Sequence, residues 1–378
     1  MPRDSFDVPL AGLGPGMGGN VRFLRYGSAE AAPKAYLHAA LHADEAPGLL
    51  VLHHLRDLLD AAEARGEILG QIVIAPYANP LGLSQVIHGD HLGRFDLASG
   101  QNFNRGWPDL APELIARLGA RLRSCAEANR ALIRATIRDI LSARRAASPL
   151  QSLFGVLAAE AFDADLVLDL HCDDEGLMHL FLHPEIWPQM QDLAAGLGCH
   201  AVFAQRGAAG GPFAAACMEP WLQLAAAFPD HPVPVGCQSA TVELRGFADV
   251  SDGLARADAL ALMDALRRRG YLAGPVPPAA APLCAMTDFA ACDMLRAPGF
   301  GVIVYHAALG ERVSKGQMVA EIVDPSGSGA AARTPVLACT DGLVLTRRLK
   351  KLVAAGQVIA KIAGETPLPH RSGYLLED

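Results

Sequence analysis

Short apolar runs that alternate with helical stretches constrain this chain more than any other feature of its sequence. KAYLHAAL (34–41) and QIVIAPYA (71–78) are bounded by turn residues, as expected of strands buried on both faces of a sheet. Between them, residues 48–66 repeat apolar side chains at helical spacing. The alternation continues with predicted helices at 111–160, 185–197, 213–227 and 251–269 and predicted strands at 163–171, 200–205 and 239–246. We therefore predict an α/β fold with a mixed, mainly parallel sheet covered by helices.

The pattern changes at a proline-rich segment. GPVPPAAAP (274–282) cannot extend a helix, and we predict that it is a linker. Residues 283–378 then contain short Val- and Ile-rich runs broken by glycines, which is typical of an all-β domain. The chain is thus predicted to divide into an α/β domain at 1–273 and a C-terminal β domain.

Two phrases in the C-terminal region nearly repeat each other. GERVSKGQMVAEI (310–322) and LKKLVAAGQVIAKI (349–362) each combine an apolar anchor, a Gly-Gln turn and a β run. This duplication resembles the barrel-sandwich hybrid fold of biotinyl and lipoyl carrier domains, in which a lysine projects from the hairpin between the halves. Here that hairpin, EIVDPSGSGAAARTPV (321–336), has no lysine. We predict an unmodified structural domain.

Composition and charge exclude several classes of partner. The net charge is -8 and Lys and Arg are scattered, which argues against a nucleic-acid surface. No window approaches the roughly 18 uninterrupted apolar residues of a membrane span, and the N-terminal stretch lacks an apolar core of signal-peptide length. The eight cysteines stand singly, as expected of reduced thiols without a metal role. We expect a cytoplasmic protein with a small-molecule partner, and a homo-oligomer is compatible with the sequence.

Polar side chains just past predicted strands are the strongest candidates for chemistry, because ligands gather at the carboxyl ends of strands in an open α/β sheet. His42 and Glu45 follow the first apolar run, and His171 closes the strand DADLVLDLH. Two imidazoles and a carboxylate are a ligand set of a catalytic zinc. The alternative is a chance His-x-x-Glu, which a chain with 13 histidines produces on the order of once. The other histidines considered, His53, His54, His88 and His91, are predicted to lie on a helix surface or in a loop.

Two further segments place charged groups in unusual surroundings. The Gly-rich stretch 93–110 presents Arg94, Asn104 and Arg105, which could bind a carboxylate or stabilise an oxyanion. The alternative is a turn whose asparagines cap the backbone. Glu243 sits inside the apolar strand SATVELRG, where a carboxylate needs a partner or a wet cleft, as a general base has. The alternative is an ion pair with Arg245, which shares its face of the strand.

Taken in order, LHADE, GRF...NFNR, DLH and TVEL resemble the succinylglutamate desuccinylase and aspartoacylase family of zinc carboxypeptidase-like hydrolases, over about residues 30–365. The resemblance implies one zinc ion per chain, held by His42, Glu45 and His171. It implies that Glu243 is the general base and acid and that Arg94 polarises the scissile carbonyl. It also implies that Asn104 and Arg105 hold the substrate carboxylate.

The sequence departs from the family pattern at Asn102. The family often has Asp at this place, where it orients a zinc histidine. An amide can orient the ring but supplies no negative charge, which predicts a slightly more electrophilic and less tightly bound metal. Asp44 and Asp169 are candidates to compensate.

The resemblance implies a zinc-dependent amidohydrolase that deacylates an N-acyl amino acid or related small amide by metal-activated water. Two alternatives stay open. One is a metallocarboxypeptidase that releases a C-terminal amino acid, since Asn104 and Arg105 would grip its carboxylate equally well. The other is a catalytically silent binding protein with the same fold. Arg206, on a loop after a predicted strand, is a further candidate for substrate contact, against an alternative as a solvent-exposed side chain.

Overall fold

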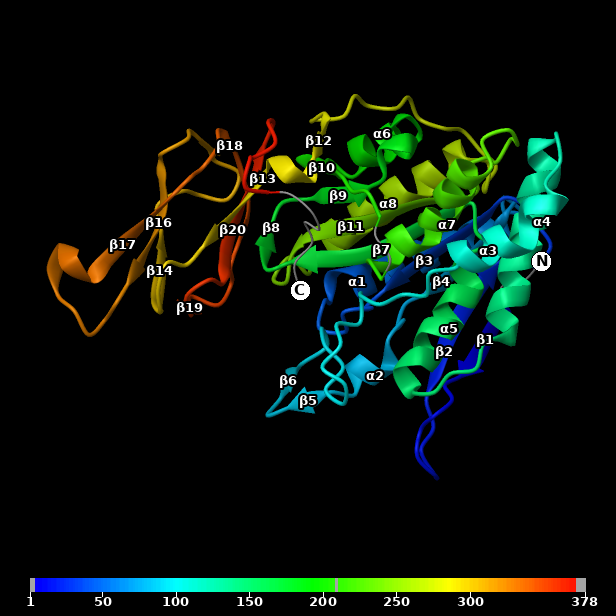
Figure 1. Cartoon of the computed structure of the whole chain (residues 1–378), viewed down its shortest axis with the longest axis horizontal. Helices are drawn as coiled ribbons and strands as arrows, with labels where there is room; N and C mark the ends of the chain where they lie inside the picture. Colours follow the sequence, from blue (N-terminus) through cyan, green and yellow to red (C-terminus); the bar gives the residue numbers. More distant parts are fainter. Residues whose placement is uncertain (1–3, 208–209, 372–378) are drawn as a thin grey trace.

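The protein is described by a computed structural model that covers residues 4–207 and 210–371. Its centre is a nine-stranded sheet (Figure 1). In spatial order the strands are β1 (Asp4–Pro9), β2 (Asn20–Tyr26), β4 (Gln71–Ala75), β3 (Lys34–Ala39), β7 (Leu166–Asp173), β11 (Gln238–Gly246), β9 (His179–Leu182), β10 (Ala201–Ala204) and β12 (Met286–Asp288).

The sheet is mixed and mainly parallel, as predicted. Strands β4, β3, β7 and β11 run parallel to one another and form its middle. The parallel group β9, β10 and β12 runs antiparallel to β11, and β1 and β2 are antiparallel additions at the other edge. The carboxyl ends of β3 and β7 therefore lie side by side.

Helices cover both faces of the sheet (Figure 1). One face packs against α1 (Pro47–Ala64), α6 (Trp187–Gly196) and α8 (Asp252–Arg268). The other packs against α3 (Ala111–Leu118), α4 (Ala126–Ala143), α5 (Pro149–Ala161) and α7 (Phe213–Ala227). Side chains alternate between the two cores along each strand: Leu37 lies in the first and Tyr36 in the second. Burial on both faces explains the continuous apolar runs in the sequence.

Residues 111–160 are helical, as predicted, but they do not form one continuous stretch. Three helices occupy this range, separated by a 3-10 turn at Gly119–Arg121 and by a loop that ends at Ser148. The Ser148 side chain caps α5 by accepting a hydrogen bond from the amide of Gln151, and Pro149 occupies the first turn. The predicted helix at 213–227 is α7 with the same bounds.

The C-terminal region is built from antiparallel strands, as predicted, and lies at one end of the molecule (Figure 1). One sheet contains β13 (Cys292–Arg296), β20 (Val358–Gly364), β18 (Gly342–Arg347) and β15 (Arg312–Val313). The other contains β17 (Arg333–Leu337), β16 (Met318–Val323), β14 (Gly301–Tyr305) and β19 (Leu352–Val353). The two near-repeats of the sequence form β15–β16 and β19–β20. Residues 372–378 of the predicted domain lie outside the described residues.

The two regions exchange short strands across the predicted boundary. Strand β8 (Glu175–Gly176) follows β7 but pairs with β18 of the C-terminal region. Strand β12, beyond the predicted linker at 274–282, pairs with β10 of the main sheet. The C-terminal region is thus joined to the main sheet by backbone hydrogen bonds as well as by side chains.

The remaining short elements lie in loops: α2 (Pro80–Leu83), the two-stranded hairpin β5 (Val86–Ile87) and β6 (Asp90–His91), and three 3-10 turns at Pro184–Ile186, Phe289–Ala291 and Gly329–Ala332. Among the described residues, no helix combines the length and apolar character that crossing a membrane requires.

Candidate metal centre

The loop between β3 and α1 carries two of the predicted ligands. After β3 the chain turns at Ala40, whose φ is 58°, and Pro47 begins α1. The short loop places His42 and Glu45 at the edge of the sheet, where both are buried. The loop is held by Gly93, whose carbonyl accepts from the amide of Ala43 at 3.0 Å. A side chain at position 93 would collide with this loop, since its Cβ would lie 2.3 Å from the amide nitrogen of Asp44.

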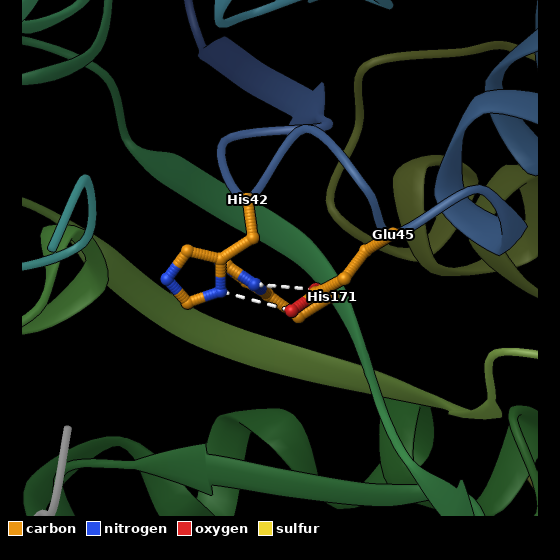
Figure 2. Close-up of side chains that lie close together, drawn as sticks. All are labelled: His42, Glu45 and His171. Carbon is orange, nitrogen blue, oxygen red and sulfur yellow. Dashed lines mark hydrogen bonds and ion pairs between the residues drawn. The ribbon is translucent and has the colours of Figure 1, made fainter. Parts of the chain in front are cut away.

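The third predicted ligand, His171, lies on β7, the strand next to β3, and its side chain reaches the other two (Figure 2). The two carboxylate oxygens of Glu45 bridge the histidines: Oε1 lies 2.9 Å from Nδ1 of His42, and Oε2 lies 2.8 Å from Nδ1 of His171. Potential ligand atoms from all three residues lie within 4.8 Å of one another. The structure thus brings the predicted ligand set together, although Glu45 and His171 are 126 positions apart in the sequence.

A different partner holds the outer nitrogen of each histidine. Nε2 of His42 lies 2.9 Å from Oδ1 of Asn102, and Nε2 of His171 lies 2.9 Å from Oδ1 of Asp169. An N–H donated to each oxygen leaves the Nδ1 lone pairs facing the centre of the cluster. Of the two acids considered as compensating groups, Asp169 contacts a predicted ligand. Oδ1 of Asp44 is buried without a hydrogen-bond partner in the part of the chain that the structure describes.

Asp169 also belongs to a buried series of hydrogen bonds that was not predicted from the sequence. Nε2 of His38 donates to Oδ1 of Asp169 at 2.7 Å, and the Tyr36 hydroxyl lies 3.1 Å from Nδ1 of His38. All three of these side chains are fully buried. The available signal was an imidazole inside the apolar run KAYLHAAL, because a buried polar side chain needs a partner.

The charges of the cluster suit a cation. Burial favours a higher pKa for Glu45, but the charges of His171 and His42 and their hydrogen bonds hold it below its usual value. Burial alone would lower the pKa of His171, but Asp169 and Glu45 raise it well above the usual value. Burial lowers the pKa of His42. A cation would replace the proton that the two carboxylates hold on His171, and the His, Glu, His donor set fits zinc.

Glu243 lies beside this cluster on β11. It is the register partner of His171 on β7 and of His179 on β9, and it is half-buried. Burial raises the pKa of Glu243 to about 7; the carboxylates of Glu45 and Asp173 act in the same direction and His171 opposes them. The alternative partner considered for it, Arg245, instead forms an ion pair with Asp258 of α8.

The loop of residues 93–106 brings Arg94 and Asn104 to the cluster, and Arg105 follows Asn104 in the chain. Arg94 is 42% exposed, and its Nη1 lies 3.4 Å from Nδ1 of His42 and 3.7 Å from Oε1 of Glu45. Asn104 is buried: its Oδ1 accepts from the amide of Phe213 at 2.7 Å, and its Nδ2 lies 3.2 Å from Nε2 of His171. Arg105 is half-buried and donates to the Asn104 carbonyl at 2.9 Å.

Two other features lie apart from the cluster. Arg206 is exposed and pairs with Asp288 of β12 at 3.0 Å. A small cavity lies between α7 and the carboxyl ends of β9 and β10, lined in part by His183, Gln205 and Glu219. None of the predicted site residues lines this cavity.

Fold and site together define a class: an α/β protein with a mainly parallel sheet whose neighbouring strand ends carry a His, Glu, His cluster that could hold a metal ion. Residues 31–225, just over half of the chain, match the model of the succinylglutamate desuccinylase/aspartoacylase catalytic domain. The chain belongs to this family, whose members are deacylases, hydrolases that act on small acyl substrates.

Solved structures share the fold of this chain. A member of the same family from Shewanella frigidimarina NCIMB 400 is 26% identical, with a TM-score of 0.81 over 96% of this chain and 97% of its own. One from Shewanella amazonensis SB2B is 22% identical, with a TM-score of 0.83 over 95% and 98%. The ectoine utilization protein EutE (DoeB) from Ruegeria pomeroyi, in a product-bound structure, is 16% identical, with a TM-score of 0.66 over 97% and 96%. A comparison with curated proteins gave no match.

Proposed function

We propose that this chain is a zinc-dependent amidohydrolase that removes the acyl group from an N-acyl amino acid or a related small amide. The observation that carries the proposal is the buried cluster of His42, Glu45 and His171 with Glu243 directly beside it. Membership of a deacylase family supports the amide as the bond that is cut.

The metal would be held by His42, Glu45 and His171, one ion per chain. A zinc ion in such a site supplies Lewis-acid polarisation of a carbonyl and a water of lowered pKa. Asn102 and Asp169 keep the two rings oriented from outside, so that their Nδ1 atoms face the centre. The Glu45 carboxylate is fixed on its other side by the amide of Cys172, which donates to Oε2 at 3.0 Å.

Glu243 is proposed as the general base and then the general acid. A carboxyl whose pKa is about 7 can accept a proton from the attacking water and later give it to the leaving amine at neutral pH. Its position next to His171, without being part of the ligand cluster, fits this role. No covalent intermediate with the protein is required.

The arginines of the 93–106 loop are proposed to contact the substrate. Arg94, half-exposed over the cluster, would stabilise the negative charge that develops on the carbonyl oxygen. Arg105 would bind the substrate carboxylate, because a guanidinium fork matches two carboxylate oxygens. The hydrogen bond that Asn104 accepts from Phe213 and its position beside His171 favour a role in holding the cluster in place, while its predicted contact with the substrate carboxylate stays a prediction.

The proposal is tested by loading the purified chain with zinc and offering it N-acetyl and N-succinyl amino acids alongside short unblocked peptides. Release of acetate or succinate supports a deacylase, whereas release of a C-terminal amino acid alone would identify a carboxypeptidase. Stoichiometric zinc without hydrolysis across this panel would favour a binding protein.

The variant Glu243→Gln separates chemistry from binding. It is expected to lower kcat by about 10² to 10⁴, the usual contribution of a general base, while zinc content stays the same. The exposed Glu365→Gln is the matched control and should retain full activity. Full activity in Glu243→Gln would remove this residue from the mechanism.

A further inference from the structure

The strand that carries Glu243 does not continue regularly beyond it. Strand β11 pairs with β7 in register up to Glu243 and His171. The next pair joins Gly246 to Asp173, so β11 has one extra residue between the two pairs. Within this interval Arg245 has a φ of 61°, in the left-handed region that residues with a Cβ rarely adopt. A β-bulge therefore begins directly after the proposed base.

The bulge changes the direction of one side chain. Val242 and Leu244 lie in the core that α8 covers, so Glu243 between them faces the opposite side of the sheet. Regular alternation would turn the side chain of Arg245 to the same side as Glu243. Instead Arg245 reaches Asp258 of α8, and its guanidinium lies on the other face of the sheet, away from the base.

The contact between Arg245 and Asp258 is bidentate and buried. Nη1 of Arg245 donates to Oδ1 of Asp258 at 3.2 Å, and Nη2 donates to Oδ2. The Asp258 side chain is 6% exposed and the Arg245 side chain 18%. A guanidinium fork holds a carboxylate in one geometry, and breaking a buried pair of this kind is costly. The pair can therefore maintain a backbone conformation that an arginine otherwise avoids.

The backbone on the far side of the bulge is fixed as well. The Gly246 amide donates to Oδ2 of Asp249 at 2.9 Å. A Cβ at Gly246 would lie 2.8 Å from the carbonyl oxygen of Asp174, so β11 packs tightly against the segment that follows β7. Among the described residues, no side chain forms a hydrogen bond or an ion pair with Glu243. The backbone of β11 therefore decides where the Glu243 carboxylate lies.

We propose that Arg245 and Asp258 are positioning residues of the active site. Their ion pair holds the left-handed backbone of the bulge, and the bulge keeps Glu243 directed to the side of the metal cluster. Without the pair, the bulge relaxes toward a regular strand, which moves Glu243 and turns the side chain of residue 245 to its face. This inference rests on the proposed role of Glu243 as base.

The competing explanation is that the ion pair only attaches α8 to the sheet. Two double variants separate the explanations, Arg245→Ala/Asp258→Asn and Arg245→Gly/Asp258→Asn. Both lose the ion pair, and neither leaves the charge of Asp258 buried without a partner. They differ by one Cβ, and glycine adopts a positive φ without the steric penalty that alanine has. If the pair only attached α8, the two variants would have equal kcat.

The ion pair of Arg269 with Asp192 is a matched control. It is also bidentate, with both distances at 2.8 Å, and its side chains are 14% and 18% exposed. It joins the end of α8 to α6, on the same face of the sheet, and has no part in the bulge. The control variant Arg269→Ala/Asp192→Asn therefore removes a comparable attachment of α8 without affecting the backbone beside Glu243.

The first measurement is turnover by the full zinc-loaded chain on a substrate that the unmodified protein hydrolyses. We expect kcat about 10- to 100-fold lower in Arg245→Ala/Asp258→Asn, with KM and zinc content nearly unchanged, because small displacements of a reacting group have effects of this size. Arg245→Gly/Asp258→Asn should stay within about threefold of the unmodified chain, and the control within about twofold. Equal kcat in the alanine and glycine variants would overturn the proposal.

A single variant repeats the test with the smallest change of shape. Asp258→Asn keeps the form of the side chain and weakens the pair, so kcat should fall less than in the alanine double variant. Adding Arg245→Gly to Asp258→Asn should then restore kcat, because glycine needs no partner to hold the bulge. If Arg245→Gly lowers kcat further, the left-handed backbone is not what the pair provides.

The second measurement does not depend on turnover. Hydrogen exchange detected by mass spectrometry reports how firmly the amides of residues 238–247 are held in the sheet. Exchange in this segment should be about tenfold faster in Arg245→Ala/Asp258→Asn than in Arg245→Gly/Asp258→Asn. If the unmodified chain hydrolyses no amide but this difference appears, the proposed function fails and the role of the pair in holding the bulge stands. Equal exchange in the two variants sinks that role even if the chain is an active deacylase.

Discussion

The two halves of the metal centre offer the same ligand atom in different surroundings. On the loop side, His42 follows β3 and is held by the neutral amide of Asn102 and faced by the half-exposed Arg94. On the strand side, His171 lies within β7 and is held by the carboxylate of Asp169, which also accepts from the fully buried His38. His42 is thus held by a neutral group of a loop near solvent, whereas His171 is held by a charged hydrogen-bond network inside the core.

This difference separates two tasks of a metal site. A carboxylate behind a histidine raises the basicity of the ligand and tightens metal binding, whereas an amide only fixes the ring. The strand side is therefore expected to contribute more to metal affinity. The loop side would leave a bound metal more electrophilic, and it carries Arg94 and Arg105, the residues proposed to contact the substrate. Glu45 joins the two halves, because its Oε1 contacts His42 and its Oε2 contacts His171.

The substitution Glu45→Ala should have the largest effect, since it breaks both halves at once. It removes a ligand and the bridge between His42 and His171, so we expect loss of stoichiometric zinc and of all hydrolysis. Metal analysis after dialysis checks this, with the exposed Glu30→Ala as control. Retention of one zinc per chain in Glu45→Ala would contradict the ligand assignment.

The pH dependence should show which half carries the base. Glu243, beside the strand-side histidine, must be deprotonated to act, and burial raises its pKa to about 7. Activity therefore rises with pH up to this value and falls about tenfold per unit below it. A bound cation favours the carboxylate, so the acid limb of kcat/KM is expected at about pH 6 to 7. A flat profile across this range would show that Glu243 is not the titrating base.

The variant Asp169→Asn should weaken the strand side without removing a ligand. It deletes the charge behind His171, and we expect a loss of about 10- to 100-fold in zinc affinity. The free energy of unfolding should also fall, by about 1 to 3 kcal/mol, because the buried bonds of His38 and His171 lose their charged acceptor. Competition with a zinc chelator and denaturant titration measure the two quantities. Zinc affinity equal to that of the unmodified chain would show that the charge is unimportant here.

The variant Asn102→Asp should have a smaller and opposite effect, because it makes the loop side resemble the strand side. Nδ2 of Asn102 is buried without a hydrogen-bond partner among the described residues, so the exchange breaks no bond that the structure records there. We expect zinc to bind up to about tenfold more tightly and kcat to fall, as the metal becomes less electrophilic. The same chelator competition and a kcat measurement check this. Weaker zinc binding would mean that burying a further charge outweighs the gain in ligand basicity.

Much of the fold could be predicted because it depends on local periodicity. The apolar runs of β3, β4, β7 and β11 and the helical spacing of α1, α7 and α8 are readable within windows of 10 to 20 residues. Strands β1, β2, β9 and β12 escaped prediction, and length alone does not explain this, because β10 has four residues, like β9, and was predicted. The break within 111–160 was missed because helix caps such as Ser148 act through single residues.

The candidate site was predictable only in its most compact motifs. His42 and Glu45 lie close in sequence, and His171 ends a recognisable strand, so all three could be named. Asn104 was also named, but its contacts with Phe213 and His171 could not be predicted, since both residues are distant in the chain. The pairing of His38 could not be predicted either, because its partner Asp169 lies 131 positions away.

By itself, the sequence determined the alternation of strands and helices, the β character of the C-terminal region and the residues of the candidate metal centre, because these depend on the types and local spacing of side chains. Only the tertiary structure decided that Asp169 and Asn102 hold different histidines and that Lys361 pairs with Asp173. These pairings depend on strand order and on the packing of the C-terminal region against β8. Hydrogen bonds and charges act over a few ångströms, and only the folded chain determines which distant residues come that close.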